Sequence, residues 1–130
     1  MTVPCNSGFQ ESAKFLVGEA ADVFKYAAVG KGTGQGAANT KLANECTETG
    51  LVRVQADTFK TVTTTIANDT VELVETYTAT TTTTVTEAGA FNNATIDTGD
   101  MLMVGDLSPT APMVSGDTLK ITMQTQIKAA

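Results

Sequence analysis

The stretch from Thr58 to Thr86 constrains the fold of this chain more than any other. About half of its residues are threonine, and valine, isoleucine, leucine, phenylalanine and tyrosine supply much of the rest. β-Branched side chains are stiff at χ1 and suit a pleated sheet better than a helix. Asn68-Asp69 divides the stretch, and both residue types form turns. We therefore predict a hairpin of Phe59–Ile66 and Val71–Thr78, followed by a third strand at Thr80–Thr86.

Further short strands flank this Thr-rich stretch. Apolar residues from Leu119 to Ile127 alternate with Lys, Thr and Gln, as in a strand with one buried face and one wet face. Leu51–Ala56 also alternates, with the valines at 52 and 54 opposite Arg53 and Gln55. The other predicted strands are Phe24–Val29 and Met101–Val104. A break in the strand pattern is expected at Glu87–Phe91, a turn or an edge crossing at Ser108–Pro112, and a turn at Ser115–Asp117.

The N-terminal third carries the helical signals. Ser7 with Gln10 three residues later fits a capping box. An apolar stripe then recurs at helical spacing, through Phe9, Ala13, Leu16, Val17 and Ala20. Two roles are open for this helix: it caps the sheet, or it is an arm that docks on a neighbouring subunit. Ala37–Cys46 is a candidate for a short second helix, with Asn39 or Thr40 as its cap.

Together these elements predict a mainly β chain. We expect an antiparallel β-sandwich or barrel-like domain with an N-terminal helix and a short second helix. Residues 1–7 are expected to form a flexible N-terminal arm, and residues 8–130 a single domain. The chain has no Trp and is only 5% aromatic, so its core must be built from Val, Leu, Ile, Ala and Met.

Composition argues against several classes of function. The net charge is -6 and the eight basic residues are scattered, whereas nucleic-acid binding needs clustered Lys and Arg. No apolar run approaches the roughly 20 residues that span a bilayer, and the N-terminus lacks the features of a signal peptide. We therefore expect a protein made inside the cell, without nucleic-acid or membrane partners. Cys5 and Cys46 are then expected to be free thiols.

Catalytic residue types are scarce. The chain has no His, and its four Ser residues do not lie in a G-x-S-x-G elbow. Gly30–Gly36 follows a predicted strand and could suggest a nucleotide loop, with Glu48 as the acidic residue beyond it. However, the P-loop pattern is absent and no βαβ unit follows. We expect a surface loop here, and no cofactor or small-molecule substrate.

Two acidic patterns are candidate sites. Asp97-Thr98-Gly99 matches the Asp-Thr-Gly of aspartic proteases, in which two such carboxylates share a proton. Only 31 residues follow Gly99, which leaves too little chain for the rest of that fold. Asp97, Asp100 and Asp106 could bind calcium, but their spacing does not fit an EF-hand loop. We expect solvated turn carboxylates, and we assign no catalytic, cofactor-binding or metal-binding residue.

Several motifs occur together in a specific order. After the N-terminal helix come Phe24–Gly30 running into Gly32-Thr33-Gly34, Thr40-x-Leu42-x-x-Glu45, Asn68-Asp69-Thr70, Glu87-Ala88-Gly89-x-Phe91 and Ser115–Thr122. From about residue 8 to 128 the chain resembles small virion structural proteins encoded in the structural modules of tailed bacteriophages. The resemblance implies a β-rich accessory virion protein with no catalytic residues to carry over.

The resemblance leads to two functional hypotheses. The first is a capsid decoration or cement protein that binds the major capsid protein, forms a homo-oligomer, expected to be a trimer, and is located in the virion after assembly in the host cytoplasm. The second is a tail, baseplate or fibre component, for which Gly30–Gly36 and Asn92–Asp100 are the candidate contact loops. A small enzyme such as an Asp97 protease is the competing class. The Thr-rich face is expected to point outward, so that single Thr→Ser changes at 81–84 cost little stability.

Overall fold

The structure, a computed structural model, describes residues 2–19 and 21–128. Over these residues the chain forms two antiparallel sheets and one helix. In chain order the elements are β1 (Val3–Pro4), α1 (Asn6–Val17), β2 (Tyr26–Gly30), β3 (Val54–Gln55), β4 (Thr58–Val62), β5 (Thr70–Thr78), β6 (Thr83–Phe91), β7 (Met101–Met113) and β8 (Thr118–Gln126). The predicted mainly β class is confirmed.

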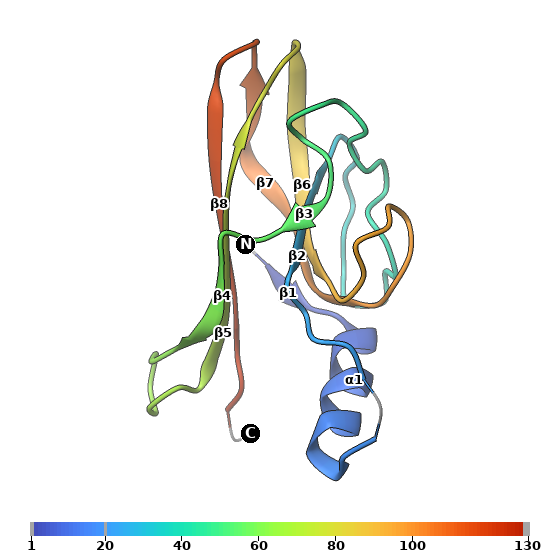
Figure 1. Ribbon diagram of the computed structural model, residues 1–130, viewed down its shortest axis with the longest axis vertical. Coiled ribbons are helices and arrows are strands. Elements are labelled where there is room, and N and C mark those ends of the chain that lie inside the picture. Colours follow the sequence, from blue (N-terminus) through green and yellow to red (C-terminus); the bar gives the residue numbers. More distant parts are fainter. Residues whose placement is uncertain (1, 20, 129–130) are drawn as a thin grey trace.

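The two sheets differ in size and remain open. The large sheet has the strand order β1-β7-β6-β2-β3, and the small sheet has the order β4-β5-β8. They do not close into a barrel, so that alternative is wrong. In Figure 1 the small sheet lies beside the large one, and α1 lies at the lower end of the large sheet. No helix among the described residues is long and apolar enough to cross a membrane.

Apolar side chains cover both faces of the large sheet. One cluster fills the space between the sheets, with Val29 and Val85 from the large sheet against Leu73 and Met123 from the small sheet. A second cluster lies on the opposite face of the large sheet and contains Cys5, Ala28, Leu42, Phe91, Met101 and Val104. As the composition predicted, the core consists mostly of Val, Leu, Ala and Met side chains.

The hairpin at the centre of the Thr-rich stretch is confirmed. β4 and β5 pair antiparallel, with Thr58 opposite Val74 and Val62 opposite Thr70. The connection contains Asn68, whose φ of 60° is tolerated by asparagine. The Asp69 carboxylate accepts hydrogen bonds from the backbone N–H groups of residues 64, 65 and 66. The Ile66 N–H and the other donors hold the pKa of Asp69 well below its usual value.

The third strand is present but lies in the other sheet. β6 pairs with β2 and β7, not with the hairpin. The break expected at Glu87–Phe91 is wrong, because these residues complete β6 and are buried. They read as a break because their pattern does not alternate, and it does not alternate because both faces of the large sheet are covered. Residues 81, 82 and 84 are exposed as expected, but Thr83 is buried.

The predicted second helix at Ala37–Cys46 is wrong. The segment is irregular, and its one ladder contact is an isolated bridge between Glu45 and Gly30. A helix requires each amide to bond the carbonyl four residues earlier. Here the amides of Ala43 and Asn44 instead donate to the Glu87 side chain in β6. A long-range contact therefore replaces the helical hydrogen bonds.

The N-terminal helix is present, but the expected capping box is not. α1 begins at Asn6, and no side chain caps its first turn. The Ser7 hydroxyl instead donates to the Met101 carbonyl oxygen of β7. The helix ends at Gly18, whose φ of 76° is the left-handed conformation typical of a helix C-terminus. Gly8 and Glu11 are its buried residues, so the predicted apolar stripe does not pack on the sheet.

The segment that we expected to be a flexible arm lies against the large sheet. Val3 pairs with Val104, and Pro4 with Met103, so β1 extends the sheet beyond β7. Cys5 is fully buried in the second apolar cluster. Met1 and Ala20, the ends of the predicted arm and stripe, lie outside the described residues.

Three other predictions had mixed outcomes. The strand at residues 51–56 shrinks to β3, and Arg53 is buried there while Val52 and Val54 are exposed. At residues 108–112 the turn is not present, but the edge alternative agrees with the structure. These residues lie within β7, in a part of the strand that pairs with β6 alone and can therefore hold prolines. The alternating last strand is confirmed as β8, which follows the predicted turn at residues 115–117.

Candidate functional site

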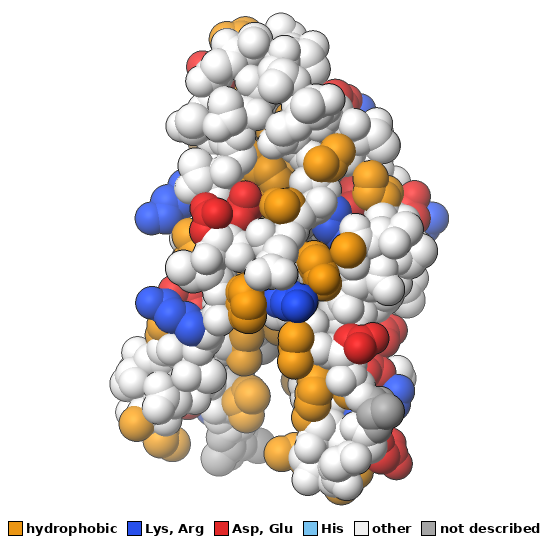
Figure 2. All heavy atoms as spheres, in the orientation of Figure 1, with side chains coloured by type: hydrophobic (Ala, Val, Ile, Leu, Met, Phe, Trp, Pro, Cys, Tyr) orange, Lys and Arg blue, Asp and Glu red, His pale blue; other side chains and the backbone are white. Residues whose placement is uncertain are grey.

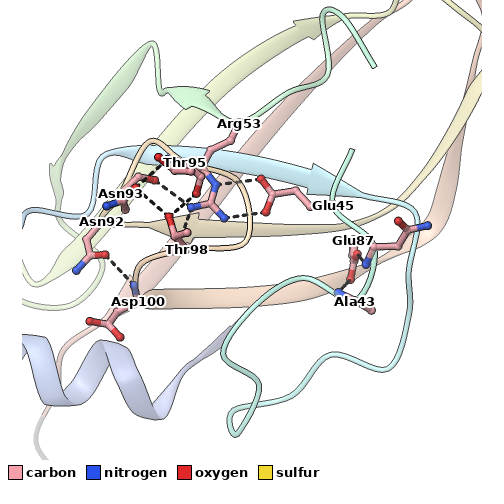
Figure 3. Close-up of polar contacts among 10 residues, drawn as sticks. Ala43, Glu45, Arg53, Glu87, Asn92, Asn93, Thr95, Thr98 and Asp100 are labelled. Carbon is pink, nitrogen blue, oxygen red and sulfur yellow. Dashed lines mark hydrogen bonds and ion pairs between the residues drawn. The ribbon is translucent and has the colours of Figure 1, made fainter. Parts of the chain in front are cut away.

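Two loops beside the large sheet are held by a set of buried polar side chains that includes Glu45, Arg53, Glu87 and Asn92. One connects β2 to β3 (residues 31–53) and contains the Gly-rich candidate Gly30–Gly36 except for Gly30, which ends β2. The other connects β6 to β7 (residues 92–100) and matches the second candidate loop, Asn92–Asp100. We call these two segments the loop platform. Figure 3 shows the side chains that hold them.

The Glu87 side chain holds the loop between β2 and β3. It lies on β6 and is fully buried. Its Oε1 accepts hydrogen bonds from the amides of Gly32 (3.1 Å) and Asn44 (2.9 Å). Its Oε2 accepts from the amide of Ala43 (3.1 Å) and from the side-chain amide of Gln35 (2.7 Å). One carboxylate therefore joins two parts of the irregular β2–β3 loop that are distant in sequence, residues 32–35 and residues 43–44. Because the acceptor is charged, these hydrogen bonds are stronger than those to a neutral acceptor.

Most amides of the Gly-rich loop are already bonded to other groups of the chain, unlike the free amides with which nucleotide loops bind a phosphate. Asp106 of β7 accepts from the amides of Gly34 (3.0 Å) and Gln35 (3.4 Å), in addition to the Glu87 contact at Gly32. Lys31, the one basic side chain of the loop, is bonded to Glu48. That bond raises the pKa of Lys31 and lowers the pKa of Glu48. The carboxylates of the chain thus occupy the positions that a phosphate would take.

Arg53 joins the two loops. Its guanidinium donates to both oxygens of Glu45, at 3.0 and 2.7 Å, and both side chains are almost completely buried. It also donates to the carbonyl oxygens of Asn93 (3.0 Å) and Thr98 (2.8 Å) in the second loop. The guanidinium lies 3.7 Å from the centre of the Phe91 ring. This forked, stacked arrangement requires arginine, because lysine offers neither the fork nor the plane.

The second loop is further closed by its own side chains. The Asn92 side-chain oxygen accepts from the Asp100 amide (2.8 Å). The Asn93 side-chain oxygen accepts from the Thr95 amide and the Thr98 hydroxyl. In Figure 3 Asn93 and Thr98 lie beside the Arg53 guanidinium, whereas Asn92 and Asp100 lie farther from it. The loop is therefore a compact structure in which most polar groups are already bonded.

The structure separates the acidic residues that we considered as sites. Asp97 is exposed at a turn with a φ of 60°, and its neighbour Thr98 is engaged by Arg53 and Asn93. Asp106 is bonded to the Gly-rich loop instead of joining Asp97 and Asp100. Among the described residues no group of three or more His, Cys, Asp or Glu side chains could hold a metal ion.

The two cysteines and the groove between β7 and β8 were also considered as sites. Cys5 and Cys46 are buried and not bonded to each other, and burial raises the pKa of each thiol to about 11. An open groove of about 660 Å³ lies between β7 and β8. Its charged lining residues are Asp106 and Lys120, and Asp106 already serves the Gly-rich loop.

Sequence reasoning identified both loops but missed the residues that hold them. Glu87 was read as part of a strand break, and Arg53 as the polar side of an alternating strand. The signal that could have found them is a charge inside an otherwise apolar or buried pattern, since such charges are normally paired.

No family model matches the chain, and no curated protein matches it at a significant level.

Proposed function

We propose that the protein is an accessory structural component of a tailed-phage virion, and that it acts as a capsid decoration or cement protein. In this proposal it binds the major capsid protein as a homo-oligomer, expected to be a trimer. It stabilises the shell by binding energy alone, without chemistry.

The observation that carries the proposal is the use of buried charge. Glu87, Arg53 and Glu45 are bonded to groups of the chain itself, and their bonds hold the loop platform in one shape. An enzyme places such groups where they can reach a substrate. A structural protein gains instead from a rigid contact surface, because a preorganised loop loses little conformational entropy on binding. The resemblance to virion structural proteins supports the same class.

The decoration role is tested on phage particles that lack the protein. We expect them to release DNA at lower temperature and in low salt, because fewer contacts hold the shell against the packaged genome. Adding purified wild-type protein to these particles should restore their resistance. Adding an Arg53→Met variant, whose loop platform is disrupted, should restore it only in part. Deficient particles as resistant as wild type would remove the cement role.

One observation supports the alternative role as a tail, baseplate or fibre component. Both loops assigned to that role, Gly30–Gly36 and Asn92–Asp100, belong to one loop platform because Arg53 and Glu87 connect their segments. A combined surface is better suited to contact a host or a neighbouring tail protein than two separate loops. Antibody labelling of intact particles in the electron microscope separates the roles. Shell labelling supports decoration, whereas labelling at the tail supports the alternative.

A further inference from the structure

Two carboxyl groups face each other where the chain crosses from the large sheet to the small sheet. β3 ends at Gln55 and β4 begins at Thr58, so residues 56 and 57 make this crossing, which Figure 1 shows between the two sheets. The β4–β5 register, with Thr58 opposite Val74, continues to place Asp57 opposite Glu75. In Figure 2 acidic side chains gather on this face at the height of the crossing.

Hydrogen bonds join the crossing and β5 in both directions. The Asp57 N–H donates to Glu75 Oε2 at 2.8 Å. Asp57 Oδ2 in turn accepts from the Thr76 N–H of β5 at 3.3 Å. That N–H lies beyond the end of β4, so the Asp57 carboxylate takes the place of the carbonyl oxygen that a longer β4 would offer. The two carboxyl groups therefore hold the crossing against β5.

No basic side chain balances this pair of acids within the part of the chain that the structure describes. None of the ion pairs there includes Asp57 or Glu75. Lys60 and Lys120, the lysines of the small sheet, lie opposite even-numbered residues of β5, whose side chains point to the other face of that sheet. Two carboxylates that lie opposite each other repel, as like charges across a ladder do.

The other neighbours of Glu75 do not supply a balancing charge either. Glu75 is buried, with 7% of its surface exposed. Its partner across the ladder on β8 is Ile121, which is apolar. On the side of the large sheet, Glu45 and Arg53 lie within electrostatic range of the neighbouring Tyr77 hydroxyl, and these two are bonded to each other.

These surroundings act on the proton affinity of Glu75. Burial raises the pKa of its carboxyl group above the usual value. The Asp57 N–H opposes this effect by favouring the charged form, whereas the negative charge of the Asp57 carboxylate raises the pKa further. Two carboxyl groups that interact so closely titrate as a pair, and one proton serves both.

We propose that Asp57 and Glu75 form a proton-sensitive link between the two sheets. With one proton between them, an O–H···O hydrogen bond to a charged acceptor holds the crossing to β5. With both groups ionised, their repulsion weakens the two backbone contacts and loosens the crossing. The proton is taken from solvent as the pH falls and is returned as the pH rises. This property of the chain is independent of the proposed virion role.

The direction of the effect follows from the linkage between proton binding and folding. A carboxyl group whose pKa is raised by folding contributes stability that is fully present below its unfolded pKa, about 4.3 for glutamate. This contribution is lost as the pH rises through the raised folded pKa. The link is therefore tight in acid and loosens once the pH exceeds the folded pKa of Glu75.

The first test follows the Glu75 carboxyl carbon by NMR while the pH of the full chain is varied. We expect the midpoint of its titration to lie above about 4.3. The midpoint should fall in Asp57→Asn, because the facing side chain then carries no charge and donates to the carboxylate. A midpoint at or below this value in wild type, or one that Asp57→Asn leaves unchanged, would overturn the proposal.

The second test compares urea unfolding at pH 5 and pH 8. Glu75→Gln mimics the protonated acid, because its oxygen can accept from the Asp57 N–H while its NH₂ group donates to the Asp57 carboxylate. We expect its folding equilibrium constant, relative to that of wild type, to be higher at pH 8 than at pH 5. The increase is up to tenfold for each unit by which the NMR midpoint is raised. An equal ratio at both pH values would contradict the link.

The control separates this pair from the charge of the whole chain. The net charge is -6, so that removing any carboxylate relieves some repulsion. Glu72→Gln makes the same change on the same strand, at a side chain that points to the other face and accepts from Gln124. A pH-dependent gain as large in Glu72→Gln as in Glu75→Gln would assign the effect to net charge and overturn the proposal.

A double variant tests whether the two carboxyl groups act as one unit. Once Asp57→Asn has removed one charge, Glu75→Gln should add no further pH dependence to the stability. A further gain at pH 8 in the double variant would show that the groups act separately, and would refute the link.

Discussion

Replacing Glu87 with glutamine tests whether this buried carboxylate builds the loop platform. Each of its two oxygens accepts two hydrogen bonds, Oε1 from Gly32 and Asn44 and Oε2 from Ala43 and Gln35. Glutamine has one acceptor oxygen, so its NH₂ group must face one of these two pairs of donors. On the Oε2 side the Gln35 carboxamide can turn and accept through its own oxygen, which leaves the Ala43 N–H as the one donor without a partner. Each buried donor left without a partner costs about 1–3 kcal/mol. The Glu87→Gln variant should therefore lose about 1–3 kcal/mol of the roughly 5–15 kcal/mol typical of a domain.

Urea unfolding followed by circular dichroism measures this loss, and amide hydrogen exchange locates it. We expect the amides of Gly32, Ala43 and Asn44 to exchange faster in Glu87→Gln than in wild type. The control is Glu19→Gln, at an exposed position after α1, which should change stability by less than about 0.5 kcal/mol. A loss below about 1 kcal/mol in Glu87→Gln, with protection at these three amides unchanged, would refute the role of the carboxylate.

Three further predictions concern other polar groups. Arg53→Lys keeps the charge but cannot make the fork to Glu45, and should lower the free energy of unfolding in urea by about 2 kcal/mol or more; a smaller loss would contradict the buried pair. The Tyr77 hydroxyl is buried without a partner among the described residues, so Tyr77→Phe should leave the melting temperature unchanged or raise it, and a clear decrease would reveal a partner. The pKa of Asp69 is lowered in the folded chain, chiefly by the Ile66 N–H, so its contribution to stability is present in full above the unfolded pKa and is lost progressively as the pH falls from there through the lowered folded pKa. Asp69→Asn should therefore destabilise the chain more at pH 7 than at pH 2, and an equal effect at both would contradict this.

The features that sequence could predict are those set by near neighbours. The β4–β5 hairpin follows from β-branched runs on either side of Asn68-Asp69, and β8 follows from strict alternation. The sheet to which β6 belongs could not be predicted in the same way. Its partner β2 is distant in the sequence, and its other partner β7 follows after a loop. The last residues of β6 are buried on both faces of the sheet, so their sequence does not alternate between apolar and polar residues.

The residues that hold the candidate site could not be predicted, because their partners are distant in the sequence. Ala37–Cys46 has a helical pattern, but the amides of Ala43 and Asn44 bond to Glu87, more than 40 residues away. Local propensity contributes only tenths of a kcal/mol per residue, whereas a hydrogen bond to a buried charge contributes about 1.5–3 kcal/mol. The long-range contact therefore decides the local structure.

The orientation of α1 yields a last prediction, in which two effects have opposite signs. In a helix interior, alanine is about 0.5–1 kcal/mol more favourable than glycine. At Gly8, however, the added Cβ would lie 2.7 Å from the Leu102 carbonyl oxygen and 2.8 Å from its Cα, both backbone atoms that cannot turn aside. Overpacking of this kind costs about 1–3 kcal/mol, so Gly8→Ala should be destabilising overall when measured by urea unfolding. The exposed position Gln10 on the same helix serves as control, where an alanine should be close to neutral. If Gly8→Ala were more stable than wild type, the helix would not be held against β7 at this point, and the apolar stripe would be free to turn toward its own core.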